Sequence, residues 1–308
     1  MKLTTSYKGF LLALLSVFAV SNVYIFSKAS LQEVNLIQFG FWWFTFALTW
    51  ITIYVIYKKT YLQFPDIPKK LYKVLIFLGV LDIFDTYFFF KAINTISNPS
   101  IVAFISNISP AFIIIASILY FKERFNIWES FGILLALFGA FVISYKGNET
   151  WNNMFVNGSQ YIVIMALFTT VITLTIKNNI QRISPIILVV NRTIFLFLFF
   201  LMAVLLLKEN VQISSFAMKN IVFGSLLGPF LAAVTGYLAL QYIPVSQKAI
   251  FDSTRGLIVL IGAYLYFGKF PNQISIIGGI ITIIGVLFIA VGKMKKRPSK
   301  KFSIINIR

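Results

Sequence analysis

Long, unbroken runs of apolar residues follow one another along the chain, separated by short polar links. A membrane-spanning helix needs about 20 predominantly apolar residues, whereas a membrane β-barrel would show strands of alternating polarity. The runs here are continuous, so the pattern predicts an all-α integral membrane protein. We expect ten transmembrane helices, near Gly9–Ser27, Leu36–Tyr57, Tyr72–Phe90, Ser100–Phe121, Ile127–Tyr145, Ser159–Ile176, Pro185–Leu207, Ala217–Gln241, Val245–Phe267 and Gln273–Val291.

The composition supports a membrane protein. Hydrophobic residues fill 59% of the 308 positions and charged residues only 12%, whereas a soluble domain carries about 25% charged residues. An unusually apolar soluble core is therefore a poor explanation. The first run, Phe10–Phe26, follows two lysines as in a signal peptide, but no small-residue cleavage site comes after it. We expect it to be a retained first helix.

The chain contains neither cysteine nor histidine. Disulfides, thiolate or imidazole metal sites, and Ser-His or Cys-His nucleophiles are therefore excluded. A phosphate-binding Walker motif is also missing, which argues against an ATP-driven pump in this chain. We expect no enzyme activity, no cofactor and no metal site.

The net charge of +18 has two explanations. It could indicate nucleic-acid binding, but in a membrane protein it more often reflects cytoplasmic loops held against anionic lipid. With the N-terminus inside, 19 Lys and Arg residues fall on the inner side and 6 on the outer side, while two Arg lie within spans. This bias predicts a multi-pass protein of the cell (inner) membrane with both termini cytoplasmic. Its expected partner is the lipid bilayer, with no nucleic acid.

An internal repeat divides the chain. Residues from Ala92 to Lys146 have an echo from Ala239 to Gly292, and matching residues such as Phe104 and Phe251 are 146 or 147 positions apart. That spacing is close to half the chain. The sequence therefore predicts two homologous halves.

The predicted domains follow from this repeat. Residues 1–146 form a first five-helix repeat, residues 158–292 form a second, and residues 293–308 form a basic cytoplasmic tail. Because five is an odd number, the second repeat enters the membrane with inverted orientation. Two inverted repeats around a central cavity are a common basis of alternating-access transporters.

Further residues of the first copy carry a family resemblance. Asn98-Pro99 and Ser109-Pro110 are followed by Leu119–Arg124 and by glycines at positions 132 and 139. With ten spans and a repeat, this layout resembles the drug/metabolite transporter superfamily, in its EamA-type branch of ten-helix carriers. The resemblance covers nearly the whole chain. It implies a bundle whose central cavity is lined mainly by the first, third, fourth, sixth, eighth and ninth helices, and it implies no substrate.

Ionisable side chains at mid-depth cost roughly 2.5–3.5 kcal/mol each on insertion. They usually face a cavity or a partner, so they mark candidate sites. The candidate substrate-binding or coupling residues are Asn22, Asp82, Asp85, Asn107, Tyr237, Lys248, Asp252 and Arg255.

Asp82 and Asp85 are three residues apart and share a helix face. Two ionised carboxylates in a partly dry site repel each other, so the pair could hold a proton near neutral pH, as a proton-coupled carrier requires. The alternative is that either residue binds substrate or pairs with a Lys or Arg of another helix.

Asp252 and Arg255 are also three residues apart. Arg255 could clamp a substrate carboxylate or phosphate, or the two could form a closed ion pair. Lys248 either adds to an anion site or extends toward the inner surface. The Tyr237 hydroxyl either meets a ligand or belongs to a core or lipid-facing ring. Arg192 is expected to have a packing or helix-terminus role.

Small residues and prolines indicate how the helices pack. Proline within a helix removes a hydrogen bond and favours a kink, and glycines let two helices approach closely. Kinks are expected at Ser109-Pro110 and Gly228-Pro229, and close packing at Gly132, Gly139, Gly278, Gly279 and Gly285.

The leading hypothesis is a secondary-active transporter, whether importer, exporter or exchanger, of a small polar or amphipathic metabolite. The mid-depth charges nearly cancel, which suits an amino-acid-like zwitterion, and a proton is a candidate coupling ion. The alternative is a non-transporting membrane scaffold or an intramembrane enzyme. A monomer and a homodimer both fit the sequence.

Overall fold

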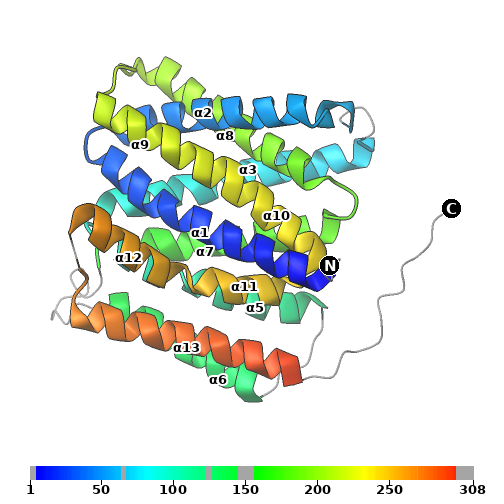
Figure 1. Ribbon diagram of the computed structural model, residues 1–308, viewed down its shortest axis with the longest axis vertical. Coiled ribbons are helices and arrows are strands. Elements are labelled where there is room, and N and C mark those ends of the chain that lie inside the picture. Colours follow the sequence, from blue (N-terminus) through cyan, green and yellow to red (C-terminus); the bar gives the residue numbers. More distant parts are fainter. Residues whose placement is uncertain (1–4, 64–66, 122–126, 145–155, 269, 296–308) are drawn as a thin grey trace.

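The computed structural model describes residues 5–63, 67–121, 127–144, 156–268 and 270–295. This described part is helical and contains no strand (Figure 1). The sequence-predicted loop residues 122–124 and most of the predicted basic tail lie outside it. The elements are α1 (Thr5–Leu31), α2 (Leu36–Tyr57), η1 (Thr60–Gln63), α3 (Lys69–Thr95), α4 (Pro99–Ile105), α5 (Ile108–Phe121), α6 (Ile127–Ser144), α7 (Ser159–Asn179), α8 (Pro185–Leu207), α9 (Ser215–Ser225), η3 (Leu226–Ala232), α10 (Ala233–Tyr242), α11 (Val245–Ser253), α12 (Arg255–Phe267) and α13 (Gln273–Lys295).

Seven helical stretches in the described part are long and apolar enough to cross a membrane. α3 is not one of them, because Asp82, Asp85 and flanking lysines interrupt its apolar run. The apolar stretches of α6 and α13 are shorter, covering Ser130–Ile143 and Gln273–Gly285. The chain is thus a multi-pass helical membrane protein, and the count of ten spans stays a prediction.

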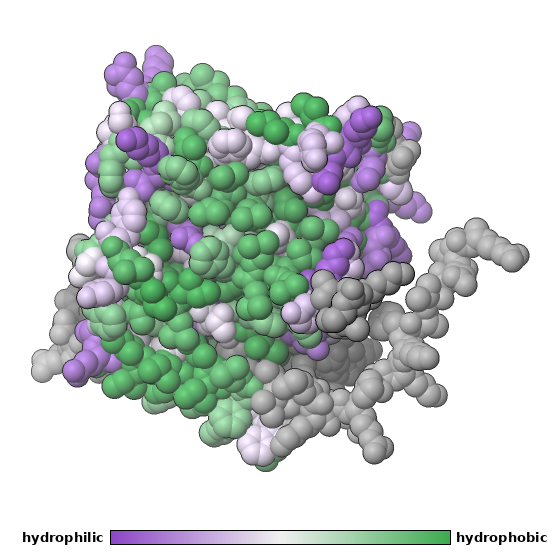
Figure 2. Space-filling view, viewed as in Figure 1, coloured by the Kyte–Doolittle hydropathy of each residue, from purple (hydrophilic) through white to green (hydrophobic). Residues whose placement is uncertain are grey.

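The outer surface matches a lipid environment. Figure 2 shows a broad hydrophobic band across the molecule, with hydrophilic residues gathered toward its two ends. Many large apolar side chains of the described residues are exposed, including Leu134, Leu205 and Leu265. In water such a surface would be an aggregation hazard, whereas in a bilayer it faces acyl chains.

Helices α6 and α13 lie side by side at one edge of the bundle (Figure 1). Glycines bring their backbones together. A Cβ atom at Gly139 would lie 2.6 Å from the Gly278 carbonyl oxygen, and one at Gly285 would lie 2.4 Å from the Ala136 nitrogen. The expected packing role is confirmed for Gly139, Gly278 and Gly285, because a Cβ atom at each would lie within 3 Å of the facing helix.

Helix interruptions occur at two equivalent places. α4 ends at Ile105 and α5 begins at Ile108, so the break lies where the Pro110 ring would clash with the carbonyl of Ser106, four residues earlier. α11 and α12 break at Thr254 without a proline. There the hydroxyl of Thr254 donates to the carbonyl of Phe251, a bond that bends helices.

A helix irregularity, but not a break, lies at the predicted kink, Gly228-Pro229. The chain passes from α9 through the π-helical segment η3 into α10, and Pro229 lies inside that segment. Proline cannot donate to the carbonyl four residues earlier, so the wider turn accommodates the missing bond.

Five buried aromatic rings form a cluster that we name the aromatic plug. Phe90 of α3 lies 4.8 Å from Phe39 and 5.7 Å from Trp43, centroid to centroid, and Phe44 stacks on Phe200 at 5.7 Å. All five are at most 3% exposed. The plug belongs to the same core cluster as Leu31, the last residue of α1.

A leucine at Gly285 should separate α6 from α13. We expect the Gly285→Leu variant to lose about 1–3 kcal/mol of unfolding free energy through overpacking, measured by thermal unfolding in mild detergent. Ile284→Leu, at an exposed neighbouring position, is the control and should stay near the unsubstituted protein. Equal stability of the two variants would contradict the close packing.

Candidate functional site

A cavity of about 240 Å³ lies inside the bundle. Its walls come from α1, α3, α5, α7, η3 with α10, and α11 with α12, which are the helices that the family resemblance implied. α2 adds Trp43 and Phe44 from the aromatic plug, and α8 adds Arg192. None of the described residues of α6 and α13 lines the cavity.

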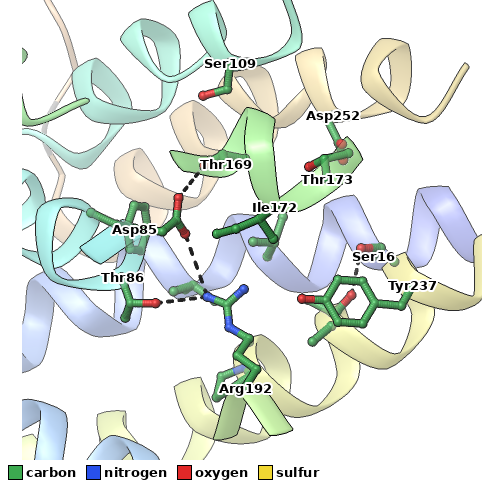
Figure 3. A pocket seen from close by; sticks show the side chains of 18 of the residues that line it. Ser16, Asp85, Thr86, Ser109, Thr169, Ile172, Thr173, Arg192, Tyr237 and Asp252 are labelled. Carbon is green, nitrogen blue, oxygen red and sulfur yellow. Dashed lines mark hydrogen bonds and ion pairs between the residues drawn. The ribbon is translucent and has the colours of Figure 1, made fainter. Parts of the chain in front are cut away.

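The first charged cluster joins α3 to α8. The Arg192 guanidinium lies 3.3 Å from an Asp82 carboxylate oxygen. It also lies 4.0 Å from a carboxylate oxygen of Asp85 (Figure 3). It also donates to the Thr86 hydroxyl at 3.1 Å. Thr169 of α7 donates a short hydrogen bond to the other Asp85 oxygen. Asp85 lines the cavity, whereas Asp82 lies outside the lining and is 2% exposed.

The structure corrects the role expected for Arg192. The resemblance put its helix away from the cavity centre, and a packing role was expected. Instead, the guanidinium lines the cavity and forms ion pairs with two carboxylates. The signal was present in the sequence, since an Arg in mid-membrane needs a partner, and the two Asp residues of α3 lacked one.

The second charged cluster lies on α11 and α12. Lys248 lies one helical turn before Asp252. Its ammonium donates to both carboxylate oxygens of Asp252, at 2.7 and 3.0 Å. The Arg255 guanidinium lies 3.9 Å from Asp252 and donates to the Tyr24 hydroxyl of α1 at 3.1 Å. The predicted Asp252–Arg255 pair is therefore present but long. Lys248 turns toward Asp252 and lines the cavity with it.

The remaining predicted residues have different places. Tyr237 lines the cavity, and its hydroxyl points toward Arg192 (Figure 3). Asn22 does not line the cavity and donates to the Phe18 carbonyl of its own helix. Asn107 is buried at the α4–α5 break, outside the lining, with no hydrogen-bond partner for its amide nitrogen.

Several neutral hydroxyls line the site and were not predicted from the sequence. Ser16, Thr169 and Thr173 line the cavity, as does Ser109, whose buried hydroxyl lacks a hydrogen-bond partner. A single Ser or Thr in an apolar helix gives no distinguishing pattern, because it can bond the carbonyl of its own preceding turn.

The two charged clusters are together electrically balanced, and apolar residues also line the cavity. Three aspartates face three cations across the two clusters, so the formal charges cancel. Apolar walls from Phe89, Phe90 and Met165 complete the space. The arrangement can hold a small molecule with separated opposite charges and an apolar part.

The chain matches a known protein family over most of its length. The EamA-like transporter family matches residues 7–145 and again residues 156–291. The chain belongs to the EamA-like transporter family. The resemblance seen in the sequence is thereby confirmed.

Two curated relatives carry similar names. The "Uncharacterized transporter YdfC" of Bacillus subtilis is 27% identical over 211 residues, covering 65% of this chain and 66% of the relative. The "Uncharacterized transporter sll1164" of Synechocystis is 23% identical over 217 residues, covering 67% of this chain and 62% of the relative. The match thus spans slightly less than two thirds of each relative's length.

A solved crystal structure shares the fold. It superposes with a TM-score of 0.70 over 96% of this chain and 100% of its own, at 12% identity. At this identity the likeness concerns the arrangement of helices alone.

Removing Arg192 should destabilise the protein, because Asp82 would remain buried and unpaired. We expect Arg192→Gln to cost about 3–5 kcal/mol of unfolding free energy, with most of it restored by adding Asp82→Asn. Thermal unfolding in detergent measures both, and Arg182→Gln in the exposed α7–α8 link is the control. No recovery in the double variant would contradict this pairing.

Proposed function

We propose that the chain is a secondary-active carrier for a small zwitterionic, amino-acid-like metabolite and that it works by alternating access. The observation that carries this proposal is the pair of charged clusters facing one cavity. In each cluster, one charged group has hydrogen-bonding capacity that its ion-pair partner does not use. Such groups can bind the two charged ends of one substrate.

The binding groups follow from the distances. Arg255 lies 3.9 Å from Asp252, and its Nε is buried with no hydrogen-bond partner, so its planar fork can bind a carboxylate. Asp85 is 4.0 Å from Arg192 and lines the cavity, so it can accept an ammonium group. The unpartnered Ser109 hydroxyl provides a further polar contact.

The size and walls of the cavity favour a small amphipathic substrate. Its volume of about 240 Å³ lies below the roughly 300–1,000 Å³ of pockets for drug-sized ligands. The aromatic and Met165 walls suit an apolar substituent. A multivalent anion would leave the aspartates facing like charge, which is unfavourable in a dry site.

The proposed architecture has ten spans in two inverted five-helix repeats, residues 1–146 and 158–292. The two family matches, within 7–145 and 156–291, support it. So do the equivalent helix breaks before Ile108 and at Thr254. We place the carrier in the cell membrane with both termini cytoplasmic, on the strength of the Lys and Arg asymmetry.

The alternatives gain no support from the site. An aspartyl-type enzyme would need two carboxylates free to share a proton over a bound substrate. Here Asp82 and Asp85 both contact Arg192. A scaffold would not require a charge-lined cavity.

Substrate binding should depend on both clusters. In proteoliposomes tested with a panel of radiolabelled amino acids, Arg255→Gln and Asp85→Asn should each weaken binding by about ten- to a hundredfold, as expected for a lost charged hydrogen bond. Lys70→Gln, at an exposed position of α3, should leave binding unchanged. Unchanged affinity in both site variants would remove this site assignment.

Proton coupling can be separated from binding. An imposed pH gradient should drive accumulation by the unsubstituted carrier if the carboxylates of α3 bind the coupling proton. Asp82→Asn should abolish that response while equilibrium exchange of substrate continues. A carrier that ignores the gradient, or an Asp82→Asn variant that still responds, would exclude this role.

A further inference from the structure

Lys28 caps the end of a neighbouring helix. Its ammonium donates to the carbonyls of Ile93 and Asn94, at 2.9 and 3.1 Å, although Lys28 is only 7% exposed. Both carbonyls belong to the last turn of α3, where no intrahelical donor is available. A cation is also favoured at this end of the helix dipole. The bond ties the end of α1 to the end of α3.

Lys177 makes the corresponding bond elsewhere in the chain. Its ammonium donates to the carbonyls of Leu240 and Ile243, at 2.6 and 3.1 Å, and the side chain is part-buried. Leu240 lies in the last turn of α10 and Ile243 caps that helix. This bond ties the end of α7 to the end of α10.

The two helix ends are equivalent positions of the repeat. Acceptor residues Ile93 and Leu240 are 147 positions apart, as are the cap residues Ile96 and Ile243. The amide of Ile96 donates to the carbonyl four residues earlier, and the amide of Ile243 does the same. Each lysine therefore joins the first predicted span of its half to the third.

The two bonds lie at opposite ends of the bundle. A Cβ atom at Gly9 would lie 2.6 Å from the Ile243 side chain, so the beginning of α1 is beside the acceptors of Lys177. Lys28 lies 19 residues further along the same helix. That is about 28 Å at 1.5 Å per residue, close to the roughly 30 Å thickness of the bilayer core.

We propose that Lys28 and Lys177 are matched latches on the two sides of the carrier, and that each half of the transport cycle opens one while the other stays bonded. The inference rests on the alternating access proposed above. Separating α1 from α3 at one end breaks the Lys28 bonds, and separating α7 from α10 at the other breaks those of Lys177. Each latch thus has two discrete states, which is what a gate needs.

The surroundings of the latches differ between the two ends. The aromatic plug, which includes Phe90, lies one turn before the acceptors of Lys28. At the other end the cavity lining reaches Ile176 and Leu240, directly beside the Lys177 bonds. The cavity is therefore bounded by residues of the aromatic plug on the Lys28 side and by residues directly beside the lysine bonds on the Lys177 side.

The test uses the absence of cysteine from the chain. Ala92→Cys and Ala239→Cys place single thiols at equivalent, fully buried positions beside the two latches. Their rates of reaction with a membrane-impermeant maleimide are measured in lipid nanodiscs, where both faces are accessible. Each reporter is combined with Lys28→Met, Lys177→Met or both. Lys219→Met and Lys70→Met, at exposed positions, are the controls.

We expect Lys28→Met to speed labelling of the Ala92→Cys reporter by about tenfold or more, because its two charged hydrogen bonds are lost, and to slow labelling of the Ala239→Cys reporter. Lys177→Met should do the reverse. The double variant should bring both rates back toward those of the unsubstituted protein, because both latches act on one equilibrium.

A purely structural role predicts another pattern. If either variant changes both reporters in the same direction, or changes neither beyond the controls, the latch proposal is overturned. If Lys28→Met does not fold, Lys28→Gln, which keeps a neutral donor, takes its place. The same labelling outcomes then decide the proposal. The labelling needs no substrate, so a panel without a transported compound would remove the proposed substrate class and leave the latches standing.

Discussion

The need to pair every charge inside an apolar bundle shapes the centre of this protein. Each ionisable group at mid-depth costs roughly 2.5–3.5 kcal/mol on insertion, and the cavity holds or borders six of them. Arg192 meets Asp82 and Asp85, while Asp252 lies between Lys248 and Arg255. Pairing turns the polar faces of α3, α8 and α11 inward and leaves apolar faces for lipid.

The same constraint applies to the backbone. Lipid offers no hydrogen bonds, so each helix interruption needs a local partner. Where α11 ends, hydroxyls of Ser253 and Thr254 bond preceding carbonyls. Where α3 and α10 end, the free carbonyls receive Lys28 and Lys177. Polar groups thus gather at the ends and breaks of helices, which are also the places where helices can move relative to one another.

The two halves of the chain share some structural features and differ in others. They share helix ends, a broken helix and close-packed glycines, and these shared parts form the frame. They differ in charge. The break of the first half offers Asn107, while that of the second half is flanked by Asp252 and Arg255. Transport selectivity in this proposal comes from the parts that diverged, and motion comes from the parts that remained alike.

The sequence alone indicated the membrane class, most helix positions and five charged candidate residues. Those properties depend on local hydrophobicity and on spacing along one helix, as for the Lys248–Asp252 and Asp252–Arg255 contacts. The sequence also resembled the EamA-like family that the comparison confirmed, because the order of spans, repeat and motifs is a property of the whole chain.

The tertiary structure decided which side chains meet across helices. Arg192 reaches Asp82 from 110 positions away, and Lys28 reaches carbonyls 65 and 66 positions away. Asn22, an equally plausible candidate in the sequence, instead donates to a carbonyl of its own helix. Hydrophobic periodicity fixes the face of a helix but not its neighbour or rotation. Neighbour and rotation follow from packing and charge pairing summed over the whole bundle, and they exist only once the chain is folded.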